Sequence, residues 1–415
     1  MNLNIHAIMS KYLTLHGTIK KYVNRKFLKV IFCVIHAAIL TVAGYWIWNI
    51  DYLRGGEDEI LKKLNTVREI LNINTKYNHE PVVLINISYD KELVTVFDKF
   101  DIPTGKIDIT DRLKIYNLLD ILYRSNNYKY ILCDIFLSRQ YQSDSDSILE
   151  ATINKMSRIR FPYNIRPEET LANTKSSYSG YSKTFLVNDF CKYEFISNKK
   201  SSLALDVWEE ITFGKFVKNG LIYKQNGKIA LNSVILSFPF TVTELYDDDG
   251  NKMIYNLGED ILNLMTEEEI INLCKDKIIL IGSFFEQDVH STIAGEMPGV
   301  LINYNAYLSL LHRNPSVPSL LFIVLFVAYF IMSLGIAFNK GLADLISFGF
   351  LKRNTRFAEF LCSWIGYGAI MTLLCIICYL LIGICPDILI MATWFTLADN
   401  ILKIKNNKQN KTENK

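Results

Sequence analysis

The sequence predicts an α/β extracytoplasmic domain with a mainly parallel central sheet and flanking helices, plus α-helical transmembrane segments. Two apolar runs, 82–88 and 278–281, have the near-continuous hydrophobicity of strands buried on both faces. A helical pattern at 111–124 connects the first run to a further strand pattern at 128–134, and this order implies a right-handed parallel crossover. Charge-free apolar stretches flank the domain and have the length of membrane helices.

The chain begins with a basic segment, 1–29, that shows no domain-sized pattern. An apolar span follows at 30–48, and we predict a transmembrane helix there. A signal peptide would have a shorter apolar core and a small-residue cleavage site, whereas this span ends in the aromatic run 45–48, so an uncleaved anchor is favoured. His36 lies inside the span. It is either a functional intramembrane group or a neutral side chain packed between helices.

Residues 49–318 form the predicted extracytoplasmic domain. Its first part, 49–80, shows apolar residues at helical spacing between charges. The β-branched run 82–88 is the first core strand. Thr110 is placed to cap the helix at 111–124. The strand at 128–134 contains Cys133, which we expect to be a buried thiol, as is Cys274.

The middle of the domain is less regular. The sequence predicts an edge strand at 160–163, an exposed loop at 173–183 and a helix at 202–211. Asn226-Gly227 is typical of the tight turn of a hairpin, so strands are expected around it within 223–240. A closing helix is predicted at 259–273.

The stretch 275–311 organises the domain. Its apolar strand ends at Gly282 and Ser283. A polar loop containing Asp288, His290 and Thr292 follows, and a helical pattern begins after Pro298-Gly299. Strand, loop and helix in this order form an α/β unit, which usually places a binding loop at the carboxyl end of the strand.

After this domain we predict three more membrane segments, at 319–338, at 360–382 and, shorter, at 386–402. Basic residues gather in 1–29, in the loop 339–359 and in the tail 403–415, while acidic residues outnumber basic ones in the central region. Under the positive-inside rule these three basic segments are cytoplasmic, and a fourth crossing is needed to place both termini inside. This charge pattern indicates membrane topology rather than nucleic-acid binding.

The sequence shows no catalytic or nucleotide-binding motif: it lacks a Ser elbow, a P-loop, HExxH and a nucleotide-binding glycine fingerprint. We therefore expect no enzyme activity, no cofactor and no metal centre. Acidic and histidine side chains at strand ends suit a divalent cation, yet they serve equally well as helix caps, turn residues and solvated charges. The set consists of Asp134, Asp144, Asp146, Asp288 and His290.

The chain resembles the CHASE2 family, extracytoplasmic sensor domains of bacterial signalling proteins. The resemblance covers about residues 40–400, patchily in the middle. Asn86 departs from it, since the family favours Asp there. The residues that carry it are Arg112, Asp134-Ile135-Phe136, Asp144, Asp146, Leu149, 202–205, 253–258, Ile281-Gly282-Ser283, Asp288, Thr292, Met297-Pro298-Gly299 and Asn305-Ala306.

This resemblance implies a membrane-anchored sensory or ligand-binding protein in the bacterial cytoplasmic membrane. Family members usually carry an output domain, whereas the predicted cytoplasmic segments are too short to fold alone. We therefore expect signalling through a separate membrane or cytoplasmic partner, in response to an unidentified small molecule; homodimerisation is left open. The alternative is a structural scaffold of an envelope membrane complex without a ligand. An extracytoplasmic metal hydrolase ranks last. The expected ligand-binding residues are Arg112, Asp134, Ser283, Asp288, His290 and Thr292.

Overall fold

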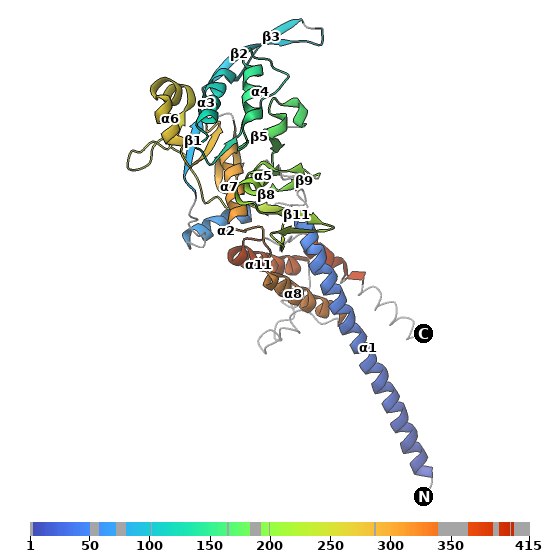
Figure 1. Cartoon of the computed structure of the whole chain (residues 1–415). Coiled ribbons are helices and arrows are strands. Elements are labelled where there is room, and N and C mark those ends of the chain that lie inside the picture. Colours follow the sequence, from blue (N-terminus) through green and yellow to red (C-terminus); the bar gives the residue numbers. More distant parts are fainter. Residues whose placement is uncertain are drawn as a thin grey trace. The chain divides into compact units, whose positions relative to one another are not determined.

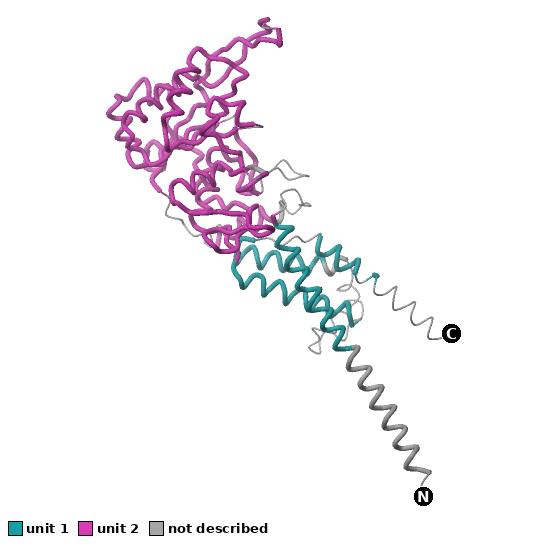
Figure 2. Tube along the Cα trace, turned by 45° about the vertical axis from the view of Figure 1, so that its right-hand side comes forward, with its two compact units in different colours: residues 1–48, 318–415 teal, residues 49–317 magenta. Residues whose placement is uncertain are grey.

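A computed structural model describes residues 3–49, 58–71, 80–100, 102–163, 166–182, 192–198, 200–285, 288–338, 364–384, 390–398 and 400–401 (Figure 1). The chain divides into two compact units (Figure 2). One combines residues Met1–Trp48 with Pro318–Lys415, and the other is Asn49–Val317. The second unit contains the α/β core, and the first contains the long apolar helices.

The α/β unit is built on a six-stranded parallel sheet in the order β15-β1-β16-β4-β5-β6. Strand β16 pairs with β1 on one side and with β4 on the other. All its residues are buried, which explains why an uninterrupted apolar run marks this strand in the sequence. The strands are β1 (Val82–Asn86), β4 (Tyr130–Cys133), β5 (Ile159–Tyr163), β6 (Ser176–Tyr178), β15 (Ile254–Asn256) and β16 (Ile278–Gly282).

Helices cover both faces of this sheet, so the predicted α/β fold is confirmed. α3, α4 and α6 share one apolar core with alternate strand residues such as Val83 and Ile131. On the opposite face, Tyr130 and Arg160 both reach Glu210 of α5, and α7 packs against β16. The helices of this unit are α2 (Asp58–Ile70), α3 (Arg112–Ser125), α4 (Asp146–Lys155), α5 (Leu203–Thr212), α6 (Glu267–Cys274), α7 (Gly299–Leu311), a π-helical turn (Leu257–Leu262) and two 3-10 turns (Pro167–Glu169 and Asn173–Lys175).

Several local predictions need correction. Asp111, not Thr110, caps α3, because its carboxylate accepts a hydrogen bond from Lys114 N at 3.0 Å. The predicted closing helix is interrupted before α6, where Thr266 and Glu269 form a capping box that starts a new helix. The strand expected at the sheet edge, 160–163, is internal, because β6 pairs beyond it. Cys133 and Cys274 are buried free thiols, as predicted.

Smaller sheets complete this unit. The hairpin of β2 and β3 extends from the core and was not predicted (Figure 1). The hairpin at Asn226-Gly227 is confirmed: both residues have positive φ, and β12 and β13 pair across them. The remaining strands are β2 (Lys91–Phe97), β3 (Pro103–Thr110), β7 (Tyr181–Ser182), β8 (Lys192–Glu194), β9 (Ile196–Ser197), β10 (Lys200–Ser201), β11 (Phe216–Asn219), β12 (Ile222–Gln225), β13 (Lys228–Ala230), β14 (Ser233–Ile235), β17 (Val289–Thr292) and β18 (Gly295–Pro298).

The other unit is helical. Among the described residues, two helices are long and apolar enough to cross a membrane: residues Lys26–Trp48 of α1 (Leu3–Trp48), and α8 (Ser319–Ala337). A third apolar helix, α11 (Trp364–Ile382), coincides with the predicted segment 360–382 and contains the apolar stretch Gly368–Leu380. The predicted loop 339–359 and tail 403–415 lie outside the described residues, as do residues 386–389, 399 and 402 of the predicted span 386–402.

His36 packs between three helices of this unit. Its Nδ1 lies 2.8 Å from Ser333 Oγ of α8, and its Nε2 accepts a hydrogen bond of 3.0 Å from Trp394 Nε1. An indole nitrogen only donates, so Nε2 carries no proton. Nδ1 then carries the proton of the neutral ring. The hydroxyl of Ser333 in turn donates a hydrogen bond to the carbonyl of Tyr329. The geometry matches a neutral histidine that joins helices.

Candidate functional site

The candidate site lies at the carboxyl edge of the sheet, where β1, β16 and β4 end side by side. The chain leaves β1 and β4 toward the face covered by α3 and α4. It leaves β16 toward the opposite face, where α7 lies. In open α/β sheets, such a reversal between neighbouring strands opens a crevice that ligands occupy. The side chains that follow these three strands therefore form the candidate site.

Asn86 ties the ends of β1 and β16 together. Its Oδ1 accepts hydrogen bonds from Ser88 N and Phe284 N, both at 3.1 Å, and its Nδ2 donates to Asn256 Oδ1 at 2.9 Å. Ser283 Oγ lies 2.8 Å from Ser88 Oγ in the same network. An aspartate, the residue that the family resemblance favours here, lacks the N–H that reaches Asn256. The predicted ligand residue Ser283 is thus buried in a closed hydrogen-bonded network.

Asp134 follows β4 and reaches the opposite face of the sheet. Its Oδ2 accepts a hydrogen bond of 3.0 Å from Asn303 Nδ2 in α7. Tyr193 OH donates to Asn303 Oδ1 at 2.9 Å, and it accepts from Ala204 N at the start of α5. Burial raises the pKa of Tyr193, so its phenol stays protonated and can donate. The carboxylate is partly accessible, whereas Asn303 and Tyr193 are fully buried.

Arg112 is the first residue of α3 and is buried. Its Nη2 donates to the carbonyl of Ser138 at 2.7 Å, and its Nη1 pairs with Asp146 at the start of α4. Its backbone N–H donates to Glu92 Oε1 at 2.9 Å. A guanidinium suits this position because its planar fork can serve a carbonyl and a carboxylate together. The structure therefore places this predicted ligand residue between two helix starts, with its charge already paired.

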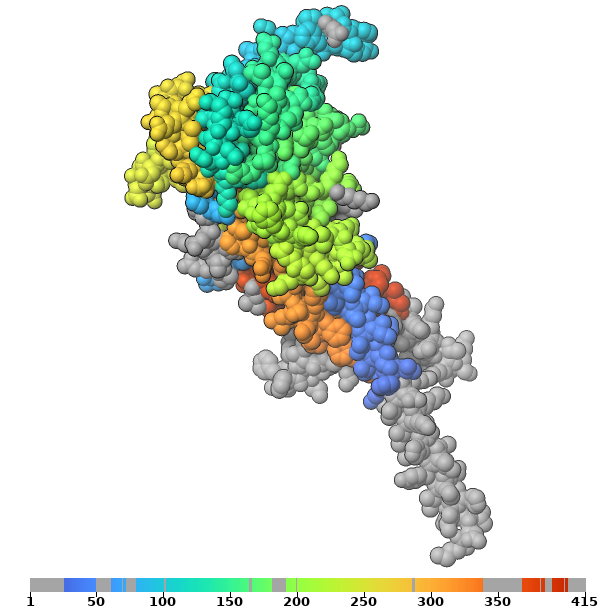
Figure 3. All heavy atoms as spheres, in the orientation of Figure 1, coloured from blue at the N-terminus to red at the C-terminus, as the bar shows by residue number. Residues whose placement is uncertain are grey.

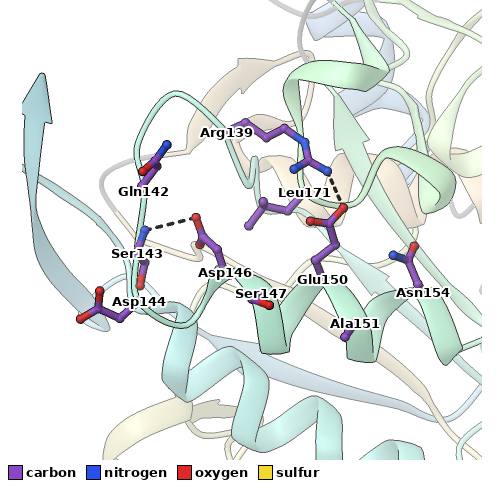
Figure 4. A pocket seen from close by; sticks show the side chains of 10 residues that line it. All are labelled: Arg139, Gln142, Ser143, Asp144, Asp146, Ser147, Glu150, Ala151, Asn154 and Leu171. Atoms are coloured by element: carbon purple, nitrogen blue, oxygen red, sulfur yellow. Dashed lines mark hydrogen bonds and ion pairs between the residues drawn. The ribbon is translucent and has the colours of Figure 1, made fainter. Parts of the chain in front are cut away.

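A polar groove of about 650 Å³ opens beside this arginine, over the loop between β4 and α4 (Figure 4). Arg139 pairs with Glu150 of α4 on one wall, and Asp146 accepts from Ser143 N at 3.2 Å on the other. Asp144 is exposed at its rim. The lining consists of Arg139, Gln142, Ser143, Asp144, Asp146, Ser147, Glu150, Ala151, Asn154 and Leu171. Hydrogen-bonding groups dominate it, which suits a polar ligand.

The predicted polar loop after β16 is a hairpin of β17 and β18. His290 Nε2 lies 2.8 Å from Asp288 Oδ1, and the carbonyl of Asp288 accepts from Gly299 N at the start of α7. Thr292 is buried, and its hydroxyl donates to the carbonyl of Gly295 at 2.8 Å. Gly295 needs a φ of +101°, which a side chain rarely permits. Thr292 thus closes a turn, while Asp288 and His290 form a half-exposed pair.

The structure therefore separates residues that the sequence placed together. Asp144 and Asp146 line the groove, Asp134 bonds to α7, and Asp288 and His290 pair in the hairpin. Within the described ranges, no three His, Cys, Asp or Glu side chains are grouped as a metal site requires. The groove residues Arg139, Glu150 and Asn154 were not predicted. For Arg139 the signal in the sequence is the polar run 138–147, which follows a parallel strand after four residues, where binding loops occur. Glu150 and Asn154 lie in the helix that follows.

The comparisons with known proteins are negative: no family model, no curated protein and no solved structure matches this chain.

Proposed function

We propose that the chain is a membrane-anchored, CHASE2-like sensory protein whose α/β unit binds a small polar molecule and signals through a separate partner. The groove over the β4–α4 loop supplies a concave site lined by hydrogen-bonding groups. Two long apolar helices support membrane anchoring. The α/β fold alone does not define a function. The resemblance of the sequence to the CHASE2 family is what favours a sensor among the functions that such a sheet can carry.

The observation that carries this proposal is the bond between Asp134 and Asn303. Asp134 follows the same strand, β4, that leads into the groove loop, and Asn303 lies in the second turn of α7. α7 is buried along nearly its full length and ends at Leu311, eight residues before α8 begins at Ser319. A ligand that shifts the β4–α4 loop would thus bias the position of the helix that leads to a candidate span.

The proposed topology places the α/β unit outside the bacterial cytoplasmic membrane and both termini in the cytoplasm. It requires four spans: the two candidate helices, the segment 360–382 and the segment 386–402. Basic residues of 1–29, 339–359 and 403–415 then all face the cytoplasm. The output partner would contact these cytoplasmic segments or the spans themselves.

A thermal-shift screen of the full chain in nanodiscs tests the sensor proposal. Small polar metabolites, including amines, polyols and organic acids, are the probes, and a saturable rise in melting temperature is expected for at least one. The variant Gln142→Ala removes a groove side chain and should weaken that rise. Gln140→Ala is the matched control, because Gln140 is an exposed glutamine of the same loop outside the groove lining.

A saturable shift that Gln142→Ala weakens and Gln140→Ala leaves intact would support the proposal. A panel without any shift would contradict it and favour the scaffold alternative. That alternative has an observation in its favour, since the polar groups around Asn86 and Ser283 already satisfy one another. Capture of membrane proteins by the full chain would then be the next measurement.

A further inference from the structure

A three-stranded meander of the α/β unit combines lysines with exposed apolar side chains. It comprises β11, β12 and β13 with their turns, and we call residues 213–230 the basic meander. Its lysines are Lys215, Lys218, Lys224 and Lys228, and it contains no Asp or Glu. The segment that includes it occupies part of the visible surface in yellow-green (Figure 3). A positive surface of this kind attracts anionic partners.

The outward face of the basic meander breaks the usual alternation of an exposed sheet. Val217 pairs with Lys224, which pairs with Ile229, so these three side chains form one row across the strands. Ile222 precedes Lys224 by two residues and shares its face. Val217, Ile222 and Ile229 are 48%, 41% and 37% exposed. A solvated sheet face would normally carry polar residues here.

Two turns project further apolar side chains. Leu221, in the turn between β11 and β12, is 66% exposed. Phe213, the C-cap residue that follows α5, is 88% exposed, although its φ of +54° is unfavourable for a bulky residue. Strain of this type persists where the surrounding structure enforces it and often marks a functional surface.

The opposite face fixes the position of the basic meander. Phe216, Tyr223 and Ala230 are buried there, and Gln225 Nε2 donates to the carbonyl of Leu310 in the last turn of α7 at 2.7 Å. The backbone N–H of Val317 donates to the carbonyl of Ile229 at 2.9 Å.

This hydrogen bond ties β13 to Val317, the last residue of the α/β unit. Val317 lies two residues before Ser319, the first residue of α8. Two residues of chain extend at most about 7 Å. The strand β13 therefore pairs with the last residue of the α/β unit, from which the chain continues directly into a candidate span.

We propose that the basic meander is a lipid-docking surface that binds anionic headgroups of the bilayer in which α8 is anchored. Lysine ammonium groups would lie at the phosphates, and the side chains of Phe213, Leu221 and Ile222 would enter the interfacial layer. The inference rests on the membrane anchoring in the proposed function. Docking would fix the α/β unit against the bilayer, so that a shift of α7 is not lost in rigid-body motion of the whole unit.

The test uses the full chain in nanodiscs of phosphatidylcholine, with or without phosphatidylglycerol, that contain a headgroup nitroxide quencher. A fluorescent NBD group is attached at Leu221→Cys. The control carries it at Leu264→Cys, a 77% exposed leucine remote in sequence from the basic meander. The unsubstituted chain, labelled in parallel, reports any reaction of native cysteines. In anionic discs, quenching at 221 should exceed that at 264 by at least about threefold, and high salt should reduce it.

A charge variant identifies the lipid as the partner. Lys215→Gln, Lys224→Gln and Lys228→Gln together should lower quenching at 221 to the level at 264. Lys99→Gln, Lys106→Gln and Lys175→Gln, three lysines elsewhere in the unit, should leave it unchanged. Equal quenching at 221 and 264 would overturn the inference. The inference would also fail if quenching at 221 were the same with and without phosphatidylglycerol and unchanged by the Lys215, Lys224 and Lys228 substitutions.

The result is distinguishable from a failure of the proposed function. Incorporation of both labelled chains into discs reports anchoring, and the thermal-shift response to polar molecules reports sensing. A chain that incorporates and responds to a ligand, yet shows no selective quenching at 221, would contradict lipid docking alone.

Discussion

Asp134 Oδ2 and Asn303 Nδ2, 3.0 Å apart, join the carboxyl end of a central strand to the buried helix that precedes a candidate membrane span. Asn303 uses its second polar atom to accept from Tyr193 OH, so one amide serves a carboxylate on one side and a phenol on the other. The amide supplies the donor and the acceptor on two separate atoms, Nδ2 and Oδ1, and both are used. The amide therefore couples β4, β8 and α7.

Replacing this amide with an apolar group of similar size should destabilise the α/β unit. Asn303→Leu would leave the Asp134 carboxylate and the buried Tyr193 hydroxyl without these bonds, at a cost of about 2–4 kcal/mol in the free energy of unfolding. Chemical denaturation of the full chain in micelles, followed by circular dichroism, measures it. Asn219→Leu is the control, because Asn219 is exposed. Equal effects of both variants would contradict a structural role for the amide.

Gly258 provides the space for an ion pair between the buried Asp90 and the partly exposed Lys114. A Cβ at this position would lie 2.4 Å from Asp90 Oδ1 and 2.8 Å from Lys114 Nζ, which bond to each other at 2.7 Å. Asp90 is buried and closely surrounded, so Gly258→Ala should break the pair and destabilise the unit by about 1–3 kcal/mol. Gly105→Ala is the matched control, since its Cβ would meet nothing within 4 Å.

The Asp90–Lys114 ion pair can also be followed through the titration of Lys114. The hydrogen bond to Asp90 raises the pKa of Lys114, so breaking the pair should return that pKa toward its ordinary value. NMR titration of selectively labelled lysines would show this change. An unaltered Lys114 titration in Gly258→Ala would mean that the ion pair survives and that our account of this glycine is wrong.

The elements that the sequence predicted correctly are those with a strong local pattern. β16 is buried on both faces and so appears as an unbroken apolar run, and α7 shows apolar residues at helical spacing after Gly299. The hairpin of β2 and β3 has no such pattern, because several of its apolar residues, including Leu93 and Phe97, are exposed. Its tip also lacks the Asn-Gly turn that made the later hairpin predictable.

The site was harder to predict because its contacts join distant parts of the chain. Arg112 was identified by resemblance, yet its partner Asp146 follows it by 34 residues. Asn303 and Asp134 are 169 residues apart. Spacing along a strand or a helix defines which face a side chain occupies. It does not define which distant residue will form a hydrogen bond or ion pair with that side chain. Asp134 and Asp288, predicted to act together, therefore lie in different networks.

Alkaline pH should destabilise the α/β unit through its buried thiols and phenols. Burial raises the pKa of Cys274 to about 12 from an ordinary value of 9.0. Above pH 9.0 the unfolded thiol loses its proton first, so the folded state binds more protons and stability falls as pH rises toward 12. Burial raises the pKa of Cys133 and Tyr130 too, and both add to the same trend.

Cys274→Ala isolates one contribution to this trend. The variant should lose a small, constant amount of stability below pH 8, and its decline above pH 9.0 should be shallower by up to about 1.4 kcal/mol per pH unit. Urea unfolding of both proteins at several pH values between 7 and 11 provides the comparison. Parallel curves over the whole range would show that this thiol does not stay protonated in the folded state.

The hydrogen bond between Trp394 and His36 should stabilise the helical unit. Trp394→Phe keeps an aromatic ring and removes the N–H that His36 Nε2 accepts, so helix association should weaken by about 0.6–1.7 kcal/mol. Trp46→Phe is the matched control, because that indole is 53% exposed on α1. Thermal unfolding of the full chain in a mild detergent measures both variants. Equal melting temperatures of Trp394→Phe and the unsubstituted chain would show that the packing of the aromatic rings, rather than this hydrogen bond, holds His36 in place.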